Sequence, residues 1–169
     1  PITNIIYEFS GGATSATVTG LPAGVTFDII GGEVIIYGTP TGPILTQTIF
    51  DYTVTTIGTC SAASLLGTIT VNPNDELSLF SAVGTEIQVL CDADSLDAIV
   101  YEFSGGATNA TVSGLPVGVN AVVTSNNVTI SGTPPAATGT TQVYPYTVTT
   151  SGACDDASLS GTITVDPND

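Results

Sequence analysis

The 169-residue sequence contains no lysine, arginine, histidine, methionine or tryptophan, and its 15 acidic residues give a formal charge of −15. Without Lys or Arg the chain cannot neutralise nucleic-acid phosphates, and it cannot form a basic patch for a membrane surface. Without His, catalysis by Ser-His-Asp or Cys-His groups is excluded, as are metal sites that need imidazole. We therefore expect no cofactor, with an oxygen-ligated cation as the one candidate exception.

Long hydrophobic runs are also missing. No run of 18 apolar residues occurs, so no membrane insertion is predicted. Hydrophobic residues nevertheless make up 42% of the chain, which is too apolar for a disordered polymer of this charge. The chain starts at Pro1 and shows no signal peptide, and we interpret it as an internal or processed piece of a longer protein.

The strongest positive feature is an internal repeat with a period of 94 residues. Residues 1–75 align without a gap to residues 95–169, and 41 of the 75 positions are identical. The segment 76–94 leads the second copy and has no counterpart in the first. We therefore predict two tandem domains, an N-terminally truncated repeat at 1–75 and a complete repeat at 76–169. Further copies are expected as partners, along one chain or between the subunits of a filament.

Hydrophobic residues alternate with polar ones, which is typical of β-strands. Val34 and Ile36 return unchanged as Val128 and Ile130, so these positions are expected to face a core. Gly, Pro and Asn clusters separate short segments, and no stretch keeps a helical period. The sequence thus predicts an all-β fold of two antiparallel sandwiches with about seven strands each.

Most aromatic residues are predicted to be core residues rather than a sugar-binding platform. They occupy alternating strand positions and recur between the copies. These residues are Tyr7, Phe9, Tyr52, Tyr101, Phe103 and Tyr146. Tyr37 and Phe50 are the aromatic residues expected to be more exposed.

Two motifs carry a resemblance to a known family. The pattern Gly-Leu-Pro-x-Gly-Val starts at Gly20 and at Gly114, and Ile-x-Gly-Thr-Pro starts at Ile36 and at Ile130. Together with Tyr-Thr-Val-Thr and Gly-Thr-Ile-Thr-Val, they resemble the tandem Ig-like and cadherin-like repeats of secreted Bacteroidota surface proteins. Giant gliding-motility adhesins of the type IX secretion system are an example. The resemblance implies an extracellular, cell-surface location and a rod or filament architecture.

The three cysteines predict a disulfide framework of two cysteines per complete repeat. We favour a bridge between Cys91 and Cys154 within the second domain. Cys60, the equivalent of Cys154, would then pair outside the chain or in a neighbouring domain. Bridges between neighbouring domains and free thiols are the alternatives. A disulfide would indicate an oxidising, extracellular compartment.

Acidic clusters and short motifs supply the candidate sites. Calcium prefers oxygen ligands, and its candidate ligands are Asp75, Glu76, Asp92, Asp94 and Asp97. The alternative for these residues is a solvated acidic surface that keeps a β protein soluble. Candidate glycosylation sites are the sequon residues Asn109 and Asn127, and Ser95 in an Asp-Ser-Leu triplet that resembles the O-glycosylation motif of Bacteroidota.

The sequence therefore predicts a non-catalytic structural repeat unit of an extracellular filament or of a long cell-surface adhesin stalk. No catalytic residue is predicted, because carboxylates are the only catalytic groups left and no pair of them marks a cleft. The alternative is a carbohydrate- or protein-binding module, with calcium and a surface glycan as its candidate ligands. Whether repeats join covalently, or through a strand donated between subunits, is left open by the sequence.

Overall fold

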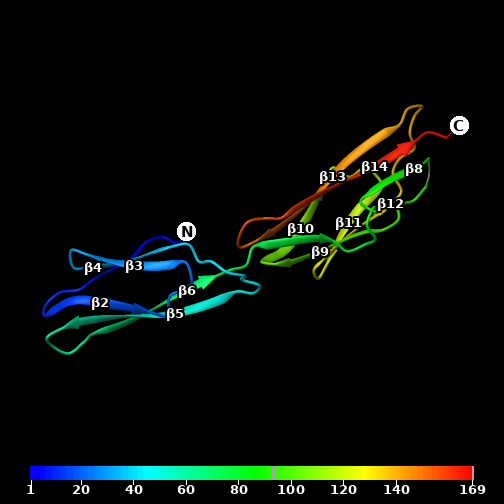
Figure 1. The fold of residues 1–169 in the computed structure, drawn as a ribbon. Coiled ribbons are helices and arrows are strands. Elements are labelled where there is room, and N and C mark those ends of the chain that lie inside the picture. Colours follow the sequence, from blue (N-terminus) through cyan, green and yellow to red (C-terminus); the bar gives the residue numbers. More distant parts are fainter. Residues whose placement is uncertain (93, 169) are drawn as a thin grey trace. The chain divides into compact units, whose positions relative to one another are not determined.

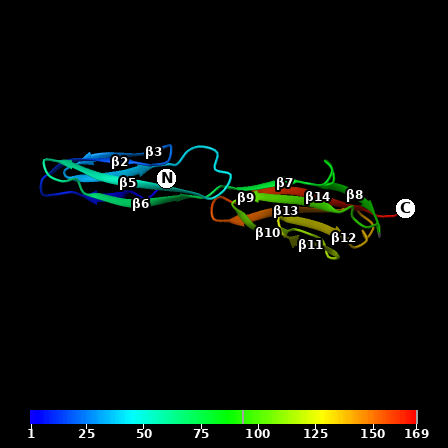
Figure 2. The same ribbon diagram turned by 90° about the horizontal axis from the view of Figure 1, so that it is seen from below.

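The computed structural model describes residues 1–92 and 94–168 and divides the chain into two compact units, Pro1–Asn72 and Pro73–Asp169. Every regular element in the described part is a β-strand, as Figures 1 and 2 show, and the all-β prediction is confirmed. The division falls three residues before the predicted boundary because Asp75 already belongs to a strand of the second unit. Two residues of the predicted second domain, Ala93 and Asp169, lie outside the described residues. The described residues contain no helix that could cross a membrane.

The first unit consists of two three-stranded sheets, with strand orders β1-β4-β3 and β2-β5-β6. All pairs in both sheets are antiparallel. The strands are β1 (Ile5–Glu8), β2 (Ala13–Thr19), β3 (Val25–Ile30), β4 (Glu33–Gly38), β5 (Thr48–Gly58) and β6 (Ser64–Val71).

The second unit repeats this plan with four strands in each sheet, in the orders β11-β12-β9-β7 and β10-β13-β14-β8. The pair β14–β8 is parallel, which differs from the purely antiparallel sandwich that the sequence predicts. The strands are β7 (Asp75–Leu79), β8 (Ile87–Cys91), β9 (Ile99–Gly105), β10 (Ala107–Ser113), β11 (Val119–Thr124), β12 (Asn127–Gly132), β13 (Gln142–Gly152) and β14 (Ser158–Asp166).

The two additional strands of the second unit come from the leading segment that the first copy lacks. β7 is an edge strand beside β9, and β8 is an edge strand beside β14. Their equivalents are absent from the described sheets of the first unit, so β1 and β6 are edge strands there. The prediction that the first sandwich lacks its leading strand segment is therefore confirmed.

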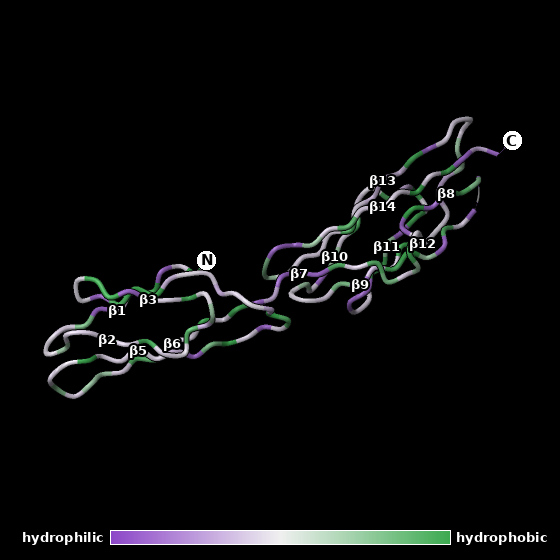
Figure 3. Tube along the Cα trace, in the orientation of Figure 1, coloured by the Kyte–Doolittle hydropathy of each residue, from purple (hydrophilic) through white to green (hydrophobic). Residues whose placement is uncertain are grey.

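Alternating hydrophobic residues build the core of each unit, as predicted. Figure 3 shows hydrophobic stretches within the strands of both units, separated by pale segments rich in Thr, Ser and Gly. Val34, Ile36, Val128 and Ile130 are each at most 1% exposed. The six aromatic residues predicted as core residues all belong to the two hydrophobic clusters, fully or partly buried.

Each core contains a pair of tyrosines that share a hydrogen bond through their hydroxyl groups. The Oη–Oη distance is 2.8 Å between Tyr7 and Tyr52, and 3.0 Å between Tyr101 and Tyr146. Burial, followed by the bond to Tyr7, raises the pKa of Tyr52 to about 12. Burial also raises the pKa of Tyr146 well above 10, with contributions from Tyr101 and from the charge of Glu86.

These pKa values predict a loss of stability at alkaline pH. An unfolded tyrosine releases its proton near pH 10, whereas Tyr52 and Tyr146 hold theirs more tightly in the folded chain. The contribution of these two tyrosines to the free energy of unfolding should therefore be constant below about pH 9 and fall as the pH rises through 10 towards about 12. Denaturant titrations at several pH values would measure this fall.

Tyr146→Phe should cost about 1 kcal/mol at neutral pH and flatten the alkaline slope of the second unit. An unchanged slope would contradict the assignment.

Candidate functional site

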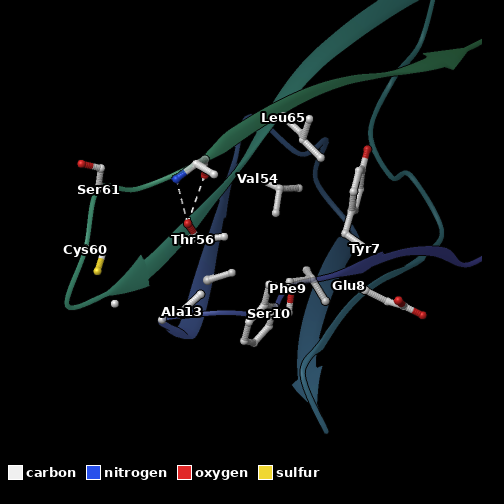
Figure 4. Close-up of a pocket in the computed structure, with 15 residues that line it drawn as sticks. Tyr7, Glu8, Phe9, Ser10, Ala13, Val54, Thr56, Cys60, Ser61 and Leu65 are labelled. Carbon is white, nitrogen blue, oxygen red and sulfur yellow. Dashed lines mark hydrogen bonds between the residues drawn. The ribbon is translucent and has the colours of Figure 1, made fainter.

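A cavity of about 280 Å³ opens in the first unit between β1 of one sheet and strands β2, β5 and β6 of the other. Figure 4 shows Tyr7 of β1, and Phe9 just after the end of β1, facing Val54, Thr56 and Leu65 across this space. The lining is more apolar than polar. It consists of Tyr7, Glu8, Phe9, Ser10, Gly12, Ala13, Ala16, Val34, Val54, Thr56, Gly58, Cys60, Ser61, Ala63 and Leu65. We call this cavity the first-unit groove.

Strand β7 occupies the equivalent place in the second unit. It pairs with β9 in antiparallel register, so that Leu77 lies opposite Phe103 and Leu79 opposite Tyr101. Phe103 and Tyr101 are the 94-residue equivalents of Phe9 and Tyr7, which line the first-unit groove. Leu77 and Leu79 both pack against the hydrophobic core of the second unit.

The absence of this strand changes the exposure of the groove residues. Tyr101 and Phe103 are 1% and 3% exposed, whereas Tyr7 and Phe9 are only partly buried. In the same way, Thr150 is buried in the second unit, whereas its equivalent in the first unit, Thr56, is only partly buried. Burying such apolar surface stabilises a fold by roughly 25 cal/mol per Å². The groove is therefore a part of the core that the described first unit leaves open.

Two of the polar side chains that line the groove, Tyr7 and Thr56, are engaged in local structure. The Thr56 hydroxyl accepts a hydrogen bond of 2.8 Å from the Ala63 backbone nitrogen, which closes the β5–β6 turn (Figure 4). Glu8 is exposed and is the one acidic residue of the lining. An apolar floor beneath the free edge of a strand suits an extended peptide better than a small polar molecule.

The predicted calcium ligands fall into two separate groups. Asp75 and Glu76 open β7, and the Asp75 backbone nitrogen donates to the Asp155 carbonyl at the β13–β14 turn. Asp92, Asp94 and Asp97 follow Cys91, the last residue of β8, which lies opposite Asp166 at the end of β14. β14 separates the two groups by roughly 25 Å, at about 3.3 Å per residue. Among the described residues, no three His, Cys, Asp or Glu side chains gather to hold a metal ion.

The predicted disulfide between Cys91 and Cys154 conflicts with the strand topology. Cys91 pairs with Asp166 at the end of β14, whereas Cys154 precedes Ser158 at its start. A disulfide requires Cα atoms about 4.4–6.8 Å apart, and the length of β14 is several times greater. No disulfide joins the cysteines in the described part of the chain, and Cys60 and Cys91 are exposed. The intradomain bridge is therefore wrong, and a bridge between neighbouring repeats remains as a prediction.

The glycosylation candidates differ in their accessibility. Ser95 and Asn109 are exposed, and Asn109 lies on the edge strand β10. Asn127 begins β12 and is partly buried, and its side-chain oxygen is buried without a hydrogen-bond partner among the described residues. Ser95 and Asn109 are therefore the accessible acceptors, and modification of all three residues stays a prediction.

The two aromatic residues expected to be exposed are partly buried. Phe50 packs against the core of the first unit. Tyr37 donates a hydrogen bond of 2.8 Å to the Asp28 carboxylate, and this bond and the adjacent negative charge raise the Tyr37 pKa.

Sequence reasoning also missed the first-unit groove, although its signal was present. The lack of a counterpart to 76–94 implies a missing strand, but only the fold shows which core residues that strand would cover.

Comparison with known sequences finds similarity to a bacterial adhesin. No family model matches the chain. Over 178 residues it is 30% identical to the "Serine-rich adhesin for platelets" of Staphylococcus aureus strain MRSA252, a match that covers 95% of this chain and 12% of the relative. The counterpart from strain N315 is 31% identical over 167 residues, covering 89% and 7%. The chain thus spans about a tenth of the length of these curated relatives.

A solved structure shows the same type of fold. The chain aligns with the Drosophila N-cadherin EC1-4 structure with a TM-score of 0.54 and 12% sequence identity. The alignment covers 92% of this chain and 41% of that chain. At this identity the likeness concerns the fold alone. The chain is a tandem β-sandwich of the Ig-like and cadherin-like type, and its sequence is similar to a segment of an adhesin.

Proposed function

We propose that the chain is a non-catalytic structural repeat module of an extracellular filament or of a long cell-surface adhesin stalk. The similarity to a staphylococcal adhesin and the cadherin-like fold support an adhesive, extracellular role. The resemblance of the Gly-Leu-Pro-x-Gly-Val and Ile-x-Gly-Thr-Pro motifs to Bacteroidota surface repeats favours the same role. Within this proposal the repeats supply length and spacing, and further copies of the repeat are the principal partners.

The proposal rests on one observation. The chain enters the second unit at one end and leaves it at the opposite end. It enters at Asp75, beside the β13–β14 turn, and leaves after Asp166, beside Cys91. Each repeat of this kind therefore advances the chain by at least the length of β14, roughly 25 Å. A fold whose ends lay together would add bulk without adding length.

The mass of the native polypeptide tests this proposal. We expect the denatured and reduced polypeptide, purified from its source, to exceed the 169-residue chain several-fold, since a stalk needs many repeats. Mass spectrometry or denaturing size separation would measure it. A native mass equal to that of the 169 residues would contradict the stalk.

The alternative, a carbohydrate- or protein-binding module, makes a different prediction. A calcium-dependent lectin should bind to a glycan array and lose its binding when a chelator is added. A structural repeat should give no signal under either condition. We expect no signal, because the acidic candidates of the second unit lie at opposite ends of β14.

A further inference from the structure

We infer that the outer face of the sheet β10-β13-β14-β8 is a contact surface, and that its partner is the same face of a second copy of this repeat. The centre of the face lies on β13, β14 and β8, which are neighbours in the second unit (Figure 1). β14 runs from the end where the chain enters this unit to the end where it leaves. The inference rests on the proposed stalk and deepens it, because it names the contact through which two stalks would associate side by side.

The centre of the face consists of two rows, each with a threonine between two apolar residues. The strand register sets these rows, and the apolar residues Val143, Val89 and Ile87 are 59%, 66% and 62% exposed. Exposed apolar side chains that are scattered singly are ordinary, whereas neighbouring ones mark an interaction surface. We call the six residues of the two rows the neutral block. The rows are Val143–Thr164–Val89 and Pro145–Thr162–Ile87.

This face is almost free of charge in a chain whose formal charge is −15. Among the described residues, the outward positions of its four strands hold one carboxylate, that of Asp166. Asp166 ends β14 and accepts a hydrogen bond of 2.6 Å from the Thr141 hydroxyl. The opposite sheet directs two carboxylates outward, those of Glu76 and Glu102. The acidic residues are therefore kept away from the neutral block.

Electrostatics selects the same face of a second copy as the partner. The chain has no Lys or Arg, so a contact between two copies through a carboxylate-bearing face brings like charges together without a counter-charge. Two neutral blocks avoid this cost, and each would remove the apolar side chains of the other from water. One self-complementary surface is sufficient for a two-fold symmetric contact. The six residues include no aromatic ring for a sugar and no charge for an ionic peptide.

The first unit provides an internal comparison for the neutral block. Ile49, the equivalent of Val143, is 61% exposed, so the apolar position is kept. Asp51 lies opposite Thr68, however, where Pro145 lies opposite Thr162 in the second unit. A carboxylate therefore interrupts this row in the first unit. We accordingly assign the contact to the second unit, and the fold of the first unit shows that an aspartate is tolerated at this strand position.

The area of the face predicts a weak contact for a single repeat. β14 is roughly 25 Å long, and four strands about 4.8 Å apart span roughly 15–20 Å. The face thus covers roughly 400–500 Å², about half of the area that each partner buries in a standard interface. One repeat should therefore associate weakly, and a series of repeats along a stalk would multiply the contact through avidity.

Sedimentation equilibrium of the full 169-residue chain tests the inference, with a reductant present to prevent disulfide cross-links. We expect reversible dimers at concentrations up to about 1 mM. Dimerisation should strengthen as salt is added, because salt screens the repulsion between acidic chains. Methyl NMR should show concentration-dependent shifts at Ile87, Val89 and Val143. Absence of dimers up to this concentration would overturn the inference, as would dimers that dissociate when a chelator removes bridging cations.

The matched variants are Pro145→Asp and Val143→Asp on the neutral block, and Val122→Asp on the opposite sheet. Val122 lies on β11 opposite Thr129 and is 54% exposed, so its substitution adds the same charge at a similar exposure. Each of the first two variants should raise the dissociation constant of the dimer at least about tenfold, and Val122→Asp less than about threefold. Equal effects of Val143→Asp and Val122→Asp would show that net charge controls association, and would exclude the neutral block as the contact.

The native mass separates this inference from the proposed stalk. A large native polypeptide whose 169-residue chain stays monomeric would keep the stalk and remove the lateral contact. Dimers that depend on the neutral block, together with a native mass equal to that of the 169 residues, would keep the contact and remove the stalk.

Discussion

Gly161→Ala is expected to unfold the second unit or to destabilise it by about 3 kcal/mol or more. Gly161 is buried in β14, and an added methyl group would collide with the Tyr146 hydroxyl and with the Glu86 backbone carbonyl. Tyr146 is 1% exposed and is held by hydrogen bonds to Tyr101 and Glu86, so its ring has no free space to enter. Overpacking a closed core costs at least 1–3 kcal/mol as a rule, and backbone collisions add to that cost. Thermal and denaturant unfolding would measure the loss.

The equivalent substitution in the first unit provides the control. The three atoms nearest to a methyl group on Gly67 all belong to the Tyr52 side chain, whereas at Gly161 a backbone carbonyl is among the nearest atoms. Tyr52 hydrogen-bonds to Tyr7, and the Tyr7 side chain lines the first-unit groove. Because that core is open, we expect Gly67→Ala to cost less than half as much as Gly161→Ala. Equal losses would show that the missing strand does not relax the packing around the tyrosine pair.

The chain is also expected to unfold in two transitions, the first unit before the second. Thirteen hydrophobic residues form the buried cluster of the second unit, against seven in the first, among the described residues. Leu77, Leu79 and Leu90 come from the strands that only the second unit has, and all three pack on its core. Their partial burial corresponds to a difference of roughly 2–4 kcal/mol, or about 10–20 °C for domains of this size.

Calorimetry would resolve the two transitions, and hydrogen exchange would assign them. Trypsin has no Lys or Arg to cleave in this chain, so the exchange experiment needs an acid protease such as pepsin. We expect amides of β5 to exchange through the lower transition, and those of its equivalent β13 through the higher one. A single cooperative transition, or earlier loss of β13, would contradict the prediction. Leu77→Ala should narrow the gap by lowering the second transition alone.

The repeat and its alternation made much of the fold predictable from the sequence. Positions that stay identical between the copies, such as Val34 and Val128, turned out to be core positions because both copies must bury the same face. The missing strand was also predictable, since residues 76–94 have no counterpart in the first copy. These predictions depended on local pattern and on counting, which a single sequence provides.

The contacts between distant residues could not be predicted in this way. Cys91 and Cys154 are a plausible pair by count, but β8 joins β14 in parallel and carries Cys91 to the far end of that strand. The separation of the calcium candidates into two groups could not be predicted for the same reason, and calcium binding by either group stays a prediction. Sequence spacing does not show which end of a sheet a turn reaches. The first-unit groove likewise needed the register of β7 on β9, which only the fold supplies.

The strand order of the second unit also determines how it would respond to tension. The chain leaves through β14, which is paired in parallel with β8 from Thr162–Ile87 to Asp166–Cys91, and it enters through β7, paired along its length with β9. A pull on the two ends therefore slides β14 past β8, and β7 past β9, rather than peeling either strand away. The hydrogen bonds of each pair are loaded together and must break together. Such shear geometry would let a marginally stable sandwich resist a brief force that would open a peeled hairpin one bond at a time.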